Sequence, residues 1–565
     1  MRIFKAQKAK TMNPIIECVP NYSEGRDKSV IDAIVAAIRS VEGVQVLDVD
    51  PGEATNRTVV TFVGAPEPVC EAAFQGARKA QELIDMRQHH GAHPRSGATD
   101  VLPLIPVAGI TLEECAVLAR KLAGRLYKEL DIPCYCYEAA AFKPERKNLA
   151  VCRAGEYEAL PEKMADPDRR PDFGGAYNDT AARSGATNVG ARNFLVAVNF
   201  NLNTTSTRRA MAVAFDVREK GRKNPSGEGW IPGTLKGCKA IGWFIDEYGI
   251  AQVSMNITDI DTTPLHIAFE EVCRAAAARG LRVTGTEIVG LVPKRVLLEA
   301  GRFYLEKQQR SLGISEEEIL RIAVRSMSLD DLKPFNPKEK VIEFLMADEA
   351  EEARRHRLVR MTAEGFARET ASESAAPGGG SVSAYMGALS AALATMVANL
   401  SAHKRGWDNR WKEFSDVAEK GQALLQELLD LVDEDTAAFD RIMACFGMPK
   451  GTEEEKAARA RALEEATLFA ASVPLRTMEA SLKALPLALE MAQKGNPASA
   501  SDAGVAALAA VAGIKGARLN VRINAAGLKD RTPALPLLER ADAIVLEAES
   551  LAAQVLDAVN NNIDI

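Results

Sequence analysis

Three of the chain's six histidines fall close together, at His89, His90 and His93. His89 and His93 have the i, i+4 spacing with which a helix presents two zinc ligands. Gly91 between them and Pro94 directly after His93 disfavour a continuous helix, because proline and its preceding residue resist helical geometry. No acidic third ligand stands at a recognisable zinc spacing either. We therefore expect no metal site here.

The surroundings of His93 contain the residue types that proton transfer needs. An imidazole titrates near neutral pH, an arginine such as Arg95 can hold a carboxylate, and an aspartate such as Asp100 can orient or support an imidazolium. From residue chemistry alone, a catalytic base at His93 and an ordinary polar turn are equally good interpretations. The polar turn accounts well for His89 and His90.

A second candidate is the carboxylate of Asp435. Leu428, Val432, Asp435 and Phe439 stand at i, i+4, i+7 and i+11 of a predicted helix, so they share one face, the apolar one. An aspartate on that face needs a partner or a raised pKa, since burying an ionised carboxylate is costly. A polar core residue bonded to a neighbouring helix is the favoured interpretation without further information. Three nearby acids should project elsewhere and be solvated: Asp433, Glu434 and Asp440.

The elements that carry these two candidates differ between the halves of the chain. The first half alternates β-rich runs with helical patterns, which is typical of α/β layers, and its two cycles predict α/β subdomains at 13–194 and 195–346. Residues 356–565 are rich in Ala, Leu and Glu with helical periodicity, which predicts an all-α helical bundle. Residues 1–12 should be a disordered leader and residues 347–355 a charged linker.

Composition restricts the function classes. The net charge of −7 and the pI near 5.7 argue against a nucleic-acid partner, whose binding surface would be basic. Nine scattered cysteines without a CxxC pair indicate reduced thiols and a cytoplasmic location. We find no apolar run that should span a bilayer, so no membrane association is expected.

Several long motifs carry a family resemblance. The first half contains "IIECVPNYSEGRD", "LDVDPGEATNRTVVTFVG", "HHGAHPRSGATDVLPLIPV", "RAGEYEALP", "RPDFGG" and "GATNVGARNFLVAVNFNL". Together these motifs resemble the glutamate formimidoyltransferase domain. With the helical half in the same chain, the sequence from about Pro14 onward resembles the formimidoyltransferase-cyclodeaminase family, the bifunctional folate enzymes of histidine breakdown.

The resemblance implies two reactions. The formimino group of N-formimino-L-glutamate would pass to tetrahydrofolate, and 5-formimidoyltetrahydrofolate would then be cyclised to 5,10-methenyltetrahydrofolate with release of ammonia. His93 would be the catalytic histidine of the first reaction and Asp435 the catalytic carboxyl of the second. The resemblance implies tetrahydrofolate as co-substrate, with or without a polyglutamate tail, no metal, and a homo-oligomer built from dimers.

Binding residues follow from the substrates. Arginines should hold the two carboxylates of formimino-glutamate, with Arg57 and Arg95 as the first candidates, while Arg183 is better explained as a solvated residue. The resemblance places folate along residues 174–185, where small residues let the backbone approach a flat ring and Tyr177 can stack on it. The other expected folate contacts in this segment are Gly174, Gly175, Ser184 and Gly185. In the helical half they are Gly379, Gly380, Ser381, Asn496 and Asp502.

Two other functions remain open at this point. Related helical domains hydrolyse methenyltetrahydrofolate, so the helical half could be a cyclohydrolase rather than a cyclodeaminase. The chain could also be a folate-binding oligomeric scaffold without activity, although the presence of both His93 and Asp435 argues against this.

Overall fold

The computed structural model describes residues 14–52, 56–90, 95–245, 248–346, 357–374 and 376–563. The expected leader (1–12), the expected linker (347–355) and His93 lie outside these residues. By contact, the chain divides into two units. One contains the residues up to 296 together with 327–346, and the other contains 297–326 together with 347–565.

The first unit begins with a mixed seven-stranded sheet in the order β1-β4-β2-β5-β7-β6, with β3 paired to β4. Its strands are β1 (Ile15–Cys18), β2 (Asn21–Tyr22), β3 (Val44–Gly52), β4 (Arg57–Gly64), β5 (Thr99–Ala108), β6 (Cys134–Glu138) and β7 (Thr187–Ala191). Strands β5, β7 and β6 are parallel to one another, whereas the pairs among β1 to β4 are antiparallel. Shorter elements follow β6: η1 (Pro144–Lys147), α4 (Leu149–Arg153), α5 (Leu160–Ala165) and α6 (Asp179–Ser184).

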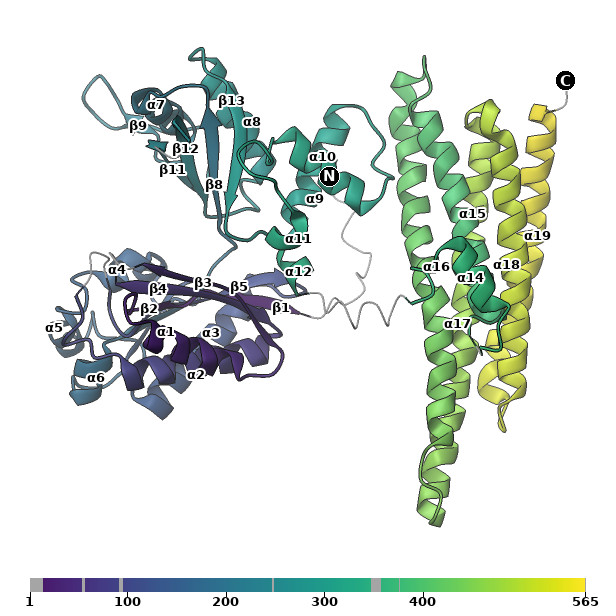
Figure 1. Cartoon of the computed structure of the whole chain (residues 1–565), viewed down its shortest axis with the longest axis horizontal. Helices are drawn as coiled ribbons and strands as arrows, with labels where there is room; N and C mark the ends of the chain where they lie inside the picture. The colour runs from purple at the N-terminus through teal and green to yellow at the C-terminus, as the bar shows by residue number, and fades with distance from the viewer. Residues whose placement is uncertain are drawn as a thin grey trace. The chain divides into compact units, whose positions relative to one another are not determined.

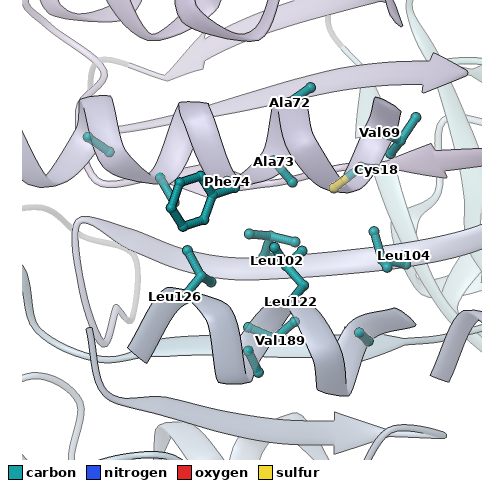
Figure 2. Close-up of a cluster of buried hydrophobic side chains, with 14 of the residues drawn as sticks. Cys18, Val69, Ala72, Ala73, Phe74, Leu102, Leu104, Leu122, Leu126 and Val189 are labelled. Carbon is teal, nitrogen blue, oxygen red and sulfur yellow. The ribbon is translucent and has the colours of Figure 1, made fainter. Parts of the chain in front are cut away.

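Three helices cover one face of this sheet: α1 (Lys28–Arg39), α2 (Pro66–Leu83) and α3 (Leu112–Leu130) (Figure 1). Helix α3 begins at a capping box in which Thr111 and Glu114 satisfy each other's backbone N–H groups. Figure 2 shows the core that results, in which Phe74 of α2, Leu102 of β5 and Leu126 of α3 are fully buried. Burying side chains of this size stabilises the fold by roughly 1.5–3 kcal/mol each.

A second, antiparallel sheet completes the first unit, in the order β11-β12-β8-β13. Its strands are β8 (Val196–Leu202), β11 (Cys238–Ile245), β12 (Ile250–Ile257) and β13 (Val283–Val289). Helices α7 (Thr207–Val217) and α8 (Leu265–Ala277) pack on it. Four small elements accompany it: β9 (Arg222–Lys223), β10 (Trp230–Ile231), α11 (Pro337–Lys340) and α12 (Ile342–Leu345).

The second unit is a bundle of long helices that run side by side in Figure 1. They are α15 (Gly379–Ala402), α16 (Trp411–Phe446), α17 (Glu453–Lys494), α18 (Ala500–Ala526) and α19 (Leu535–Ile563), preceded by α14 (Ala363–Thr370). Single turns η2 (Asp408–Arg410), η3 (Pro497–Ser499) and η4 (Thr532–Ala534) stand between successive long helices. The predicted fold class, two α/β subdomains followed by an all-α bundle, is confirmed.

Helices α9 (Lys294–Lys307) and α10 (Glu316–Ser326) precede the expected linker, yet most of this hairpin groups with the bundle. The turn between the two helices approaches α16 closely. A Cβ on Gly313 in this turn would lie only 2.3 Å from the Ala418 side chain. The backbone N–H of Leu312 donates to the Ser415 hydroxyl over 3.0 Å. Periodicity gave no sign of this docking, since it depends on partners about a hundred residues away.

The expectation that no apolar run is long enough to span a bilayer is wrong for two helices of the bundle. Gly379–Ala402 and Pro497–Ala526 are both long and apolar enough to cross a membrane by length and composition. Much of each helix is buried in the bundle, 61% and 50% of the respective windows. A helix that is apolar on several sides is what a bundle core requires, so these helices are weak evidence for a membrane.

Candidate active sites

The segment that follows His93 is anchored by ion pairs of the Arg95 side chain. The Arg95 guanidinium pairs with Glu158 (Nη2 to Oε1, 2.7 Å) and with Glu156 (Nη1 to Oε2, 3.1 Å). These carboxylates raise the pKa of Arg95, Glu158 most strongly. The sequence predicted that Arg95 holds a substrate carboxylate; in the structure it holds two carboxylates of the chain itself, from the motif "RAGEYEALP".

The segment that precedes His93 is anchored by the side chain of His89. His89 is buried, whereas an ordinary polar turn would leave it exposed. Its Nε2 lies 2.9 Å from the Asn56 carbonyl oxygen and its Nδ1 lies 3.4 Å from Nε of Arg95. A carbonyl only accepts hydrogen bonds, so Nε2 donates and Nδ1 accepts, which is the neutral imidazole. Burial lowers the pKa of His89 in agreement with this. His89 therefore holds the chain in place as a neutral imidazole with both ring nitrogens engaged, and it is not the group that transfers a proton.

The Asp100 carboxylate is fully buried and is paired with Arg153. It also accepts the backbone N–H of Ser96 over 2.9 Å. Arg57 is close enough to be affected by this pair: burial lowers the pKa of Arg57, Arg153 lowers it further, and Asp100 opposes both. Arg57 and Arg153 thus form one cationic region around a buried carboxylate. Sequence reasoning missed Arg153, and its only signal was its position at the start of "RAGEYEALP".

The expected folate segment, 174–185, has two parts with different roles. Tyr177 is 38% exposed, so its ring is accessible. Burial, and after it the nearby Tyr177, raises the pKa of Tyr157 to about 12. Gly175 lies near the Tyr127 hydroxyl, which would be 3.2 Å from an added Cβ. Gly174 lies against Pro171 in the same way.

Ser184 and Gly185 have a packing role that the sequence did not predict. The carbonyl of Ser184 accepts the N–H of Ala98 over 2.7 Å. Gly185 has a φ of +67°, and a Cβ there would lie 2.3 Å from the carbonyl oxygen of Ser96. Only glycine tolerates both the positive φ and this close contact. Ser184 and Gly185 therefore pack against the segment that follows His93 and hold it in place.

In the helical unit, Asp435 lies beside the first turn of α15. The Ser381 hydroxyl donates to Oδ2 of Asp435 over 3.1 Å. Gly380 makes the approach possible, because a Cβ there would lie 2.1 Å from Oδ1 of Asp435. Burial raises the pKa of Asp435, and the hydroxyl and backbone hydrogen bonds from Ser381 partly oppose that rise. A half-buried carboxyl whose pKa is raised is better suited to holding and donating a proton than a solvated one.

A pocket of about 180 Å³ opens onto this carboxyl. Its lining comprises Ala376, Gly378, Gly379, Gly380, Asp435, Thr436, Phe439, Ile442, Ala470, Asn520 and Asn524. The structure thus brings Asp435 together with the predicted Gly379, Gly380 and Ser381. Thr436, Asn520 and Asn524 were not predicted from the sequence. Two asparagines four residues apart, and hence on one face of a predicted helix, were the available signal.

Asn496 and Asp502 do not belong to this pocket within one chain. The backbone N–H of Asn496 donates to the hydroxyl of Ser401, near the C-terminal end of α15. Asp502 lies in the first turn of α18, at the same end of the bundle. Ser381 and Ser401 are separated by about 30 Å of helix at 1.5 Å per residue. The antiparallel course of α15 and α18 therefore separates these two residues from Asp435.

Two predictions about the neighbours of Asp435 are wrong. Asp433 is only 8% exposed, and it accepts the backbone N–H of Leu358 over 2.8 Å, so it anchors the chain that enters the unit. Phe439, predicted on the buried face, is 40% exposed and lines the pocket. The apolar face of α16 leaves the bundle core at this point.

Within the described part of the chain, no three His, Cys, Asp or Glu side chains are grouped so as to hold a metal ion.

Comparisons with known proteins cover both units. Residues 15–192 match the family "Formiminotransferase domain, N-terminal subdomain", residues 197–347 match "Formiminotransferase domain", and residues 362–543 match "Formiminotransferase-cyclodeaminase". The chain is 44% identical over 548 residues to the formimidoyltransferase-cyclodeaminase of Sus scrofa, covering 97% of this chain and 99% of that one.

Two shorter relatives each match one half. The glutamate formimidoyltransferase of Streptococcus pyogenes is 42% identical over 295 residues, 52% of this chain and 94% of its own length. The methenyltetrahydrofolate cyclohydrolase of Methylorubrum extorquens is 39% identical over 203 residues, 36% of this chain and 98% of its own length.

Proposed function

The chain belongs to the formimidoyltransferase-cyclodeaminase family, and we propose that it catalyses both reactions which that name describes. It transfers the formimino group of N-formimino-L-glutamate to tetrahydrofolate and then cyclises 5-formimidoyltetrahydrofolate to 5,10-methenyltetrahydrofolate with release of ammonia. The observation that carries the proposal is the half-buried Asp435 carboxyl facing a pocket, in a chain that matches the bifunctional relative over 97% of its length.

In the first reaction, nitrogen 5 of tetrahydrofolate attacks the amidine carbon of formimino-glutamate and the glutamate amine leaves. One group can take the proton from the attacking nitrogen and give it to the leaving one. We assign this role to His93. The braces at His89 and Arg95 support the assignment, since they hold the chain on both sides of that histidine. Arg57, beside Arg153, is our candidate for binding a substrate carboxylate.

In the second reaction, nitrogen 10 of the folate attacks the formimino carbon. The new carbon–nitrogen bond forms, the proton of nitrogen 10 is lost, and the formimino nitrogen gains a proton and leaves as ammonia with the electron pair of its bond. Asp435 can mediate this transfer, because burial raises its pKa and so favours the protonated carboxyl that passes a proton on. Ser381 orients the carboxyl through its hydroxyl.

Incubating the full chain with formimino-glutamate and tetrahydrofolate tests the proposal. We expect glutamate, ammonium and methenyltetrahydrofolate in equal amounts. Folate binding without any product would support the inactive scaffold instead.

A second candidate function is favoured by one observation. The helical half resembles the Methylorubrum protein named methenyltetrahydrofolate cyclohydrolase, which adds water to the methenyl group rather than expelling ammonia. Supplying 5-formimidoyltetrahydrofolate and methenyltetrahydrofolate separately distinguishes the two functions. Ammonium from the first compound with slow consumption of the second supports the cyclodeaminase, and the reverse supports the cyclohydrolase.

The proposed assembly is a homo-oligomer built from dimers of the helical unit. Large apolar side chains are exposed along two neighbouring helices: Leu389, Met396 and Leu400 on α15, and Leu508, Leu519 and Ile523 on α18. An apolar surface of this kind is typical of an interface between subunits. Light scattering of the purified chain, with Ile523→Lys as the disrupting variant, tests the dimer.

Two finer proposals concern location and substrate form. A cytoplasmic location is supported by the nine cysteines, all of which are free thiols. Cell fractionation tests this location. A polyglutamate tail on the folate is tested by comparing the KM of the first reaction for tetrahydrofolate with one and with five glutamates.

A further inference from the structure

Two asparagines on α18, Asn520 and Asn524, line the same pocket as Asp435. Their four-residue spacing places them one helical turn apart on the same face. Both are half-buried. The described residues of this pocket therefore combine a carboxyl with two carboxamides and with the glycine turn that begins α15.

The orientation of each carboxamide is fixed by its own hydrogen bond. Nδ2 of Asn520 donates to the carbonyl oxygen of Gly516 over 3.0 Å, and Nδ2 of Asn524 donates to the carbonyl oxygen of Ala470 over 2.7 Å. A carbonyl oxygen cannot donate, so the amide nitrogen, not the amide oxygen, must face it.

Each amide oxygen is consequently turned away from those carbonyls. Within the part of the chain that the structure describes, neither oxygen accepts a hydrogen bond. The pocket therefore offers two uncommitted acceptors beside Asp435, whose Oδ2 already accepts from Ser381. Such a set of acceptors suits a ligand group that carries N–H donors and positive charge.

We propose that Asn520 and Asn524 accept hydrogen bonds from the formimino nitrogen of 5-formimidoyltetrahydrofolate and thereby select a formimino group over a formyl group. The proposal rests on the proposed function of the helical unit. A protonated formimino group presents N–H donors to the two oxygens, whereas a formyl group presents a carbonyl oxygen, and acceptor facing acceptor is unfavourable. A site built to bind N–H rejects the analogue without it, because its own polar groups are left unpaired.

The same contacts favour the reaction. As nitrogen 10 bonds to the formimino carbon, the electron pair of the C=N bond moves onto the departing nitrogen and the positive charge moves to nitrogen 10. Nitrogen 10 then gives up its proton, and the departing nitrogen receives one through Asp435, so that the charge becomes concentrated on an ammonium group. That nitrogen then leaves as ammonia with the electron pair of the broken bond. Its N–H groups are stronger donors in the transition state than in the bound substrate, so the two carboxamides lower the barrier as well as bind.

The test measures selectivity in the full chain with two folates. The kcat/KM for ammonia release from 5-formimidoyltetrahydrofolate is compared with the inhibition constant of 5-formyltetrahydrofolate against that same reaction. Asn520→Ala should fold, because alanine is the better helix former and the lost bond lies within α18. Asn562→Ala is the matched control, since the Asn562 amide donates to the Ala492 carbonyl away from the pocket.

We expect Asn520→Ala to lower kcat/KM by about tenfold or more, the usual effect of losing a hydrogen bond to a charged group, with no weakening of formyl inhibition. Asn562→Ala should match the wild type. Equal losses for both folates in Asn520→Ala, or no loss for either, would overturn the assignment. An inactive wild type would instead refute the proposed function, so the two failures are distinguishable.

Discussion

Replacing Gly380 by alanine should inactivate the second site without unfolding it. The added Cβ would lie 2.1 Å from Oδ1 and 2.5 Å from Cγ of Asp435, whereas real Cβ contacts essentially never fall under 3.0 Å. The carboxyl must therefore move by about 1 Å, and a misplacement of that size costs roughly a hundredfold in rate, or about 2.7 kcal/mol of barrier.

The stability of Gly380→Ala should change much less. Overpacking costs about 1–3 kcal/mol, and the better helix propensity of alanine returns up to about 1 kcal/mol. The Asp435 carboxyl can swing into the pocket to relieve the contact, so the cost should fall at the lower end. Activity and stability are thereby separable in this variant.

The assay follows ammonia release from 5-formimidoyltetrahydrofolate, glutamate release in the first reaction, and urea denaturation. Gly504→Ala is the matched control, because a Cβ there meets Val559 and Leu556 at ordinary distances of 3.5–3.8 Å. In an Asp435→Asn background, Gly380→Ala should cause no further loss, since both changes act on one group. Full deaminase activity in Gly380→Ala, or an equal loss in glutamate release, would refute the reasoning.

Three further predictions concern buried acids. Burial raises the pKa of Glu17 from 4.5 to about 7. The wild type therefore loses stability as the pH rises from 4.5 to 7, because the unfolded chain releases this proton first. In thermal denaturation, Glu17→Gln should be up to about 3 kcal/mol more stable than the wild type at pH 8, with no advantage at pH 4. Asp100→Ala leaves the Arg153 charge without its buried partner and should cost about 3–5 kcal/mol in urea denaturation; a change under about 1 kcal/mol would contradict the pairing. Asp433→Ala removes the acceptor of the Leu358 N–H, so it should cost about 1–3 kcal/mol and speed proteolysis near residue 358, whereas unchanged proteolysis would contradict the anchor.

Helical periodicity predicted part of the arrangement around Asp435. The 3.6-residue period placed Asp435 on a face that meets other helices, and the glycines that precede an Ala-rich run lie where α15 begins beside it. Both signals are local, so they survive without knowledge of the fold. The α/β order of the first half was readable for the same reason.

Long-range contacts were not readable. Arg95 pairs with carboxylates about sixty residues away, and Asp433 is buried only because Leu358 returns to cover it. Within one chain, Asn496 lies at the opposite end of the bundle from Asp435, and composition does not reveal which ends of antiparallel helices meet. Pairing partners and helix direction are properties of the tertiary fold, which a single-residue pattern does not encode.

The proposed function depends most on two separate proton-transfer groups, His93 for the first reaction and Asp435 for the second. A single-turnover experiment with formimino-glutamate and tetrahydrofolate, run on His93→Ala and on Asp435→Asn, tests this directly. His93→Ala should release no glutamate. Asp435→Asn should release glutamate normally and accumulate 5-formimidoyltetrahydrofolate without ammonium. Ammonium release by Asp435→Asn at the wild-type rate would contradict the account.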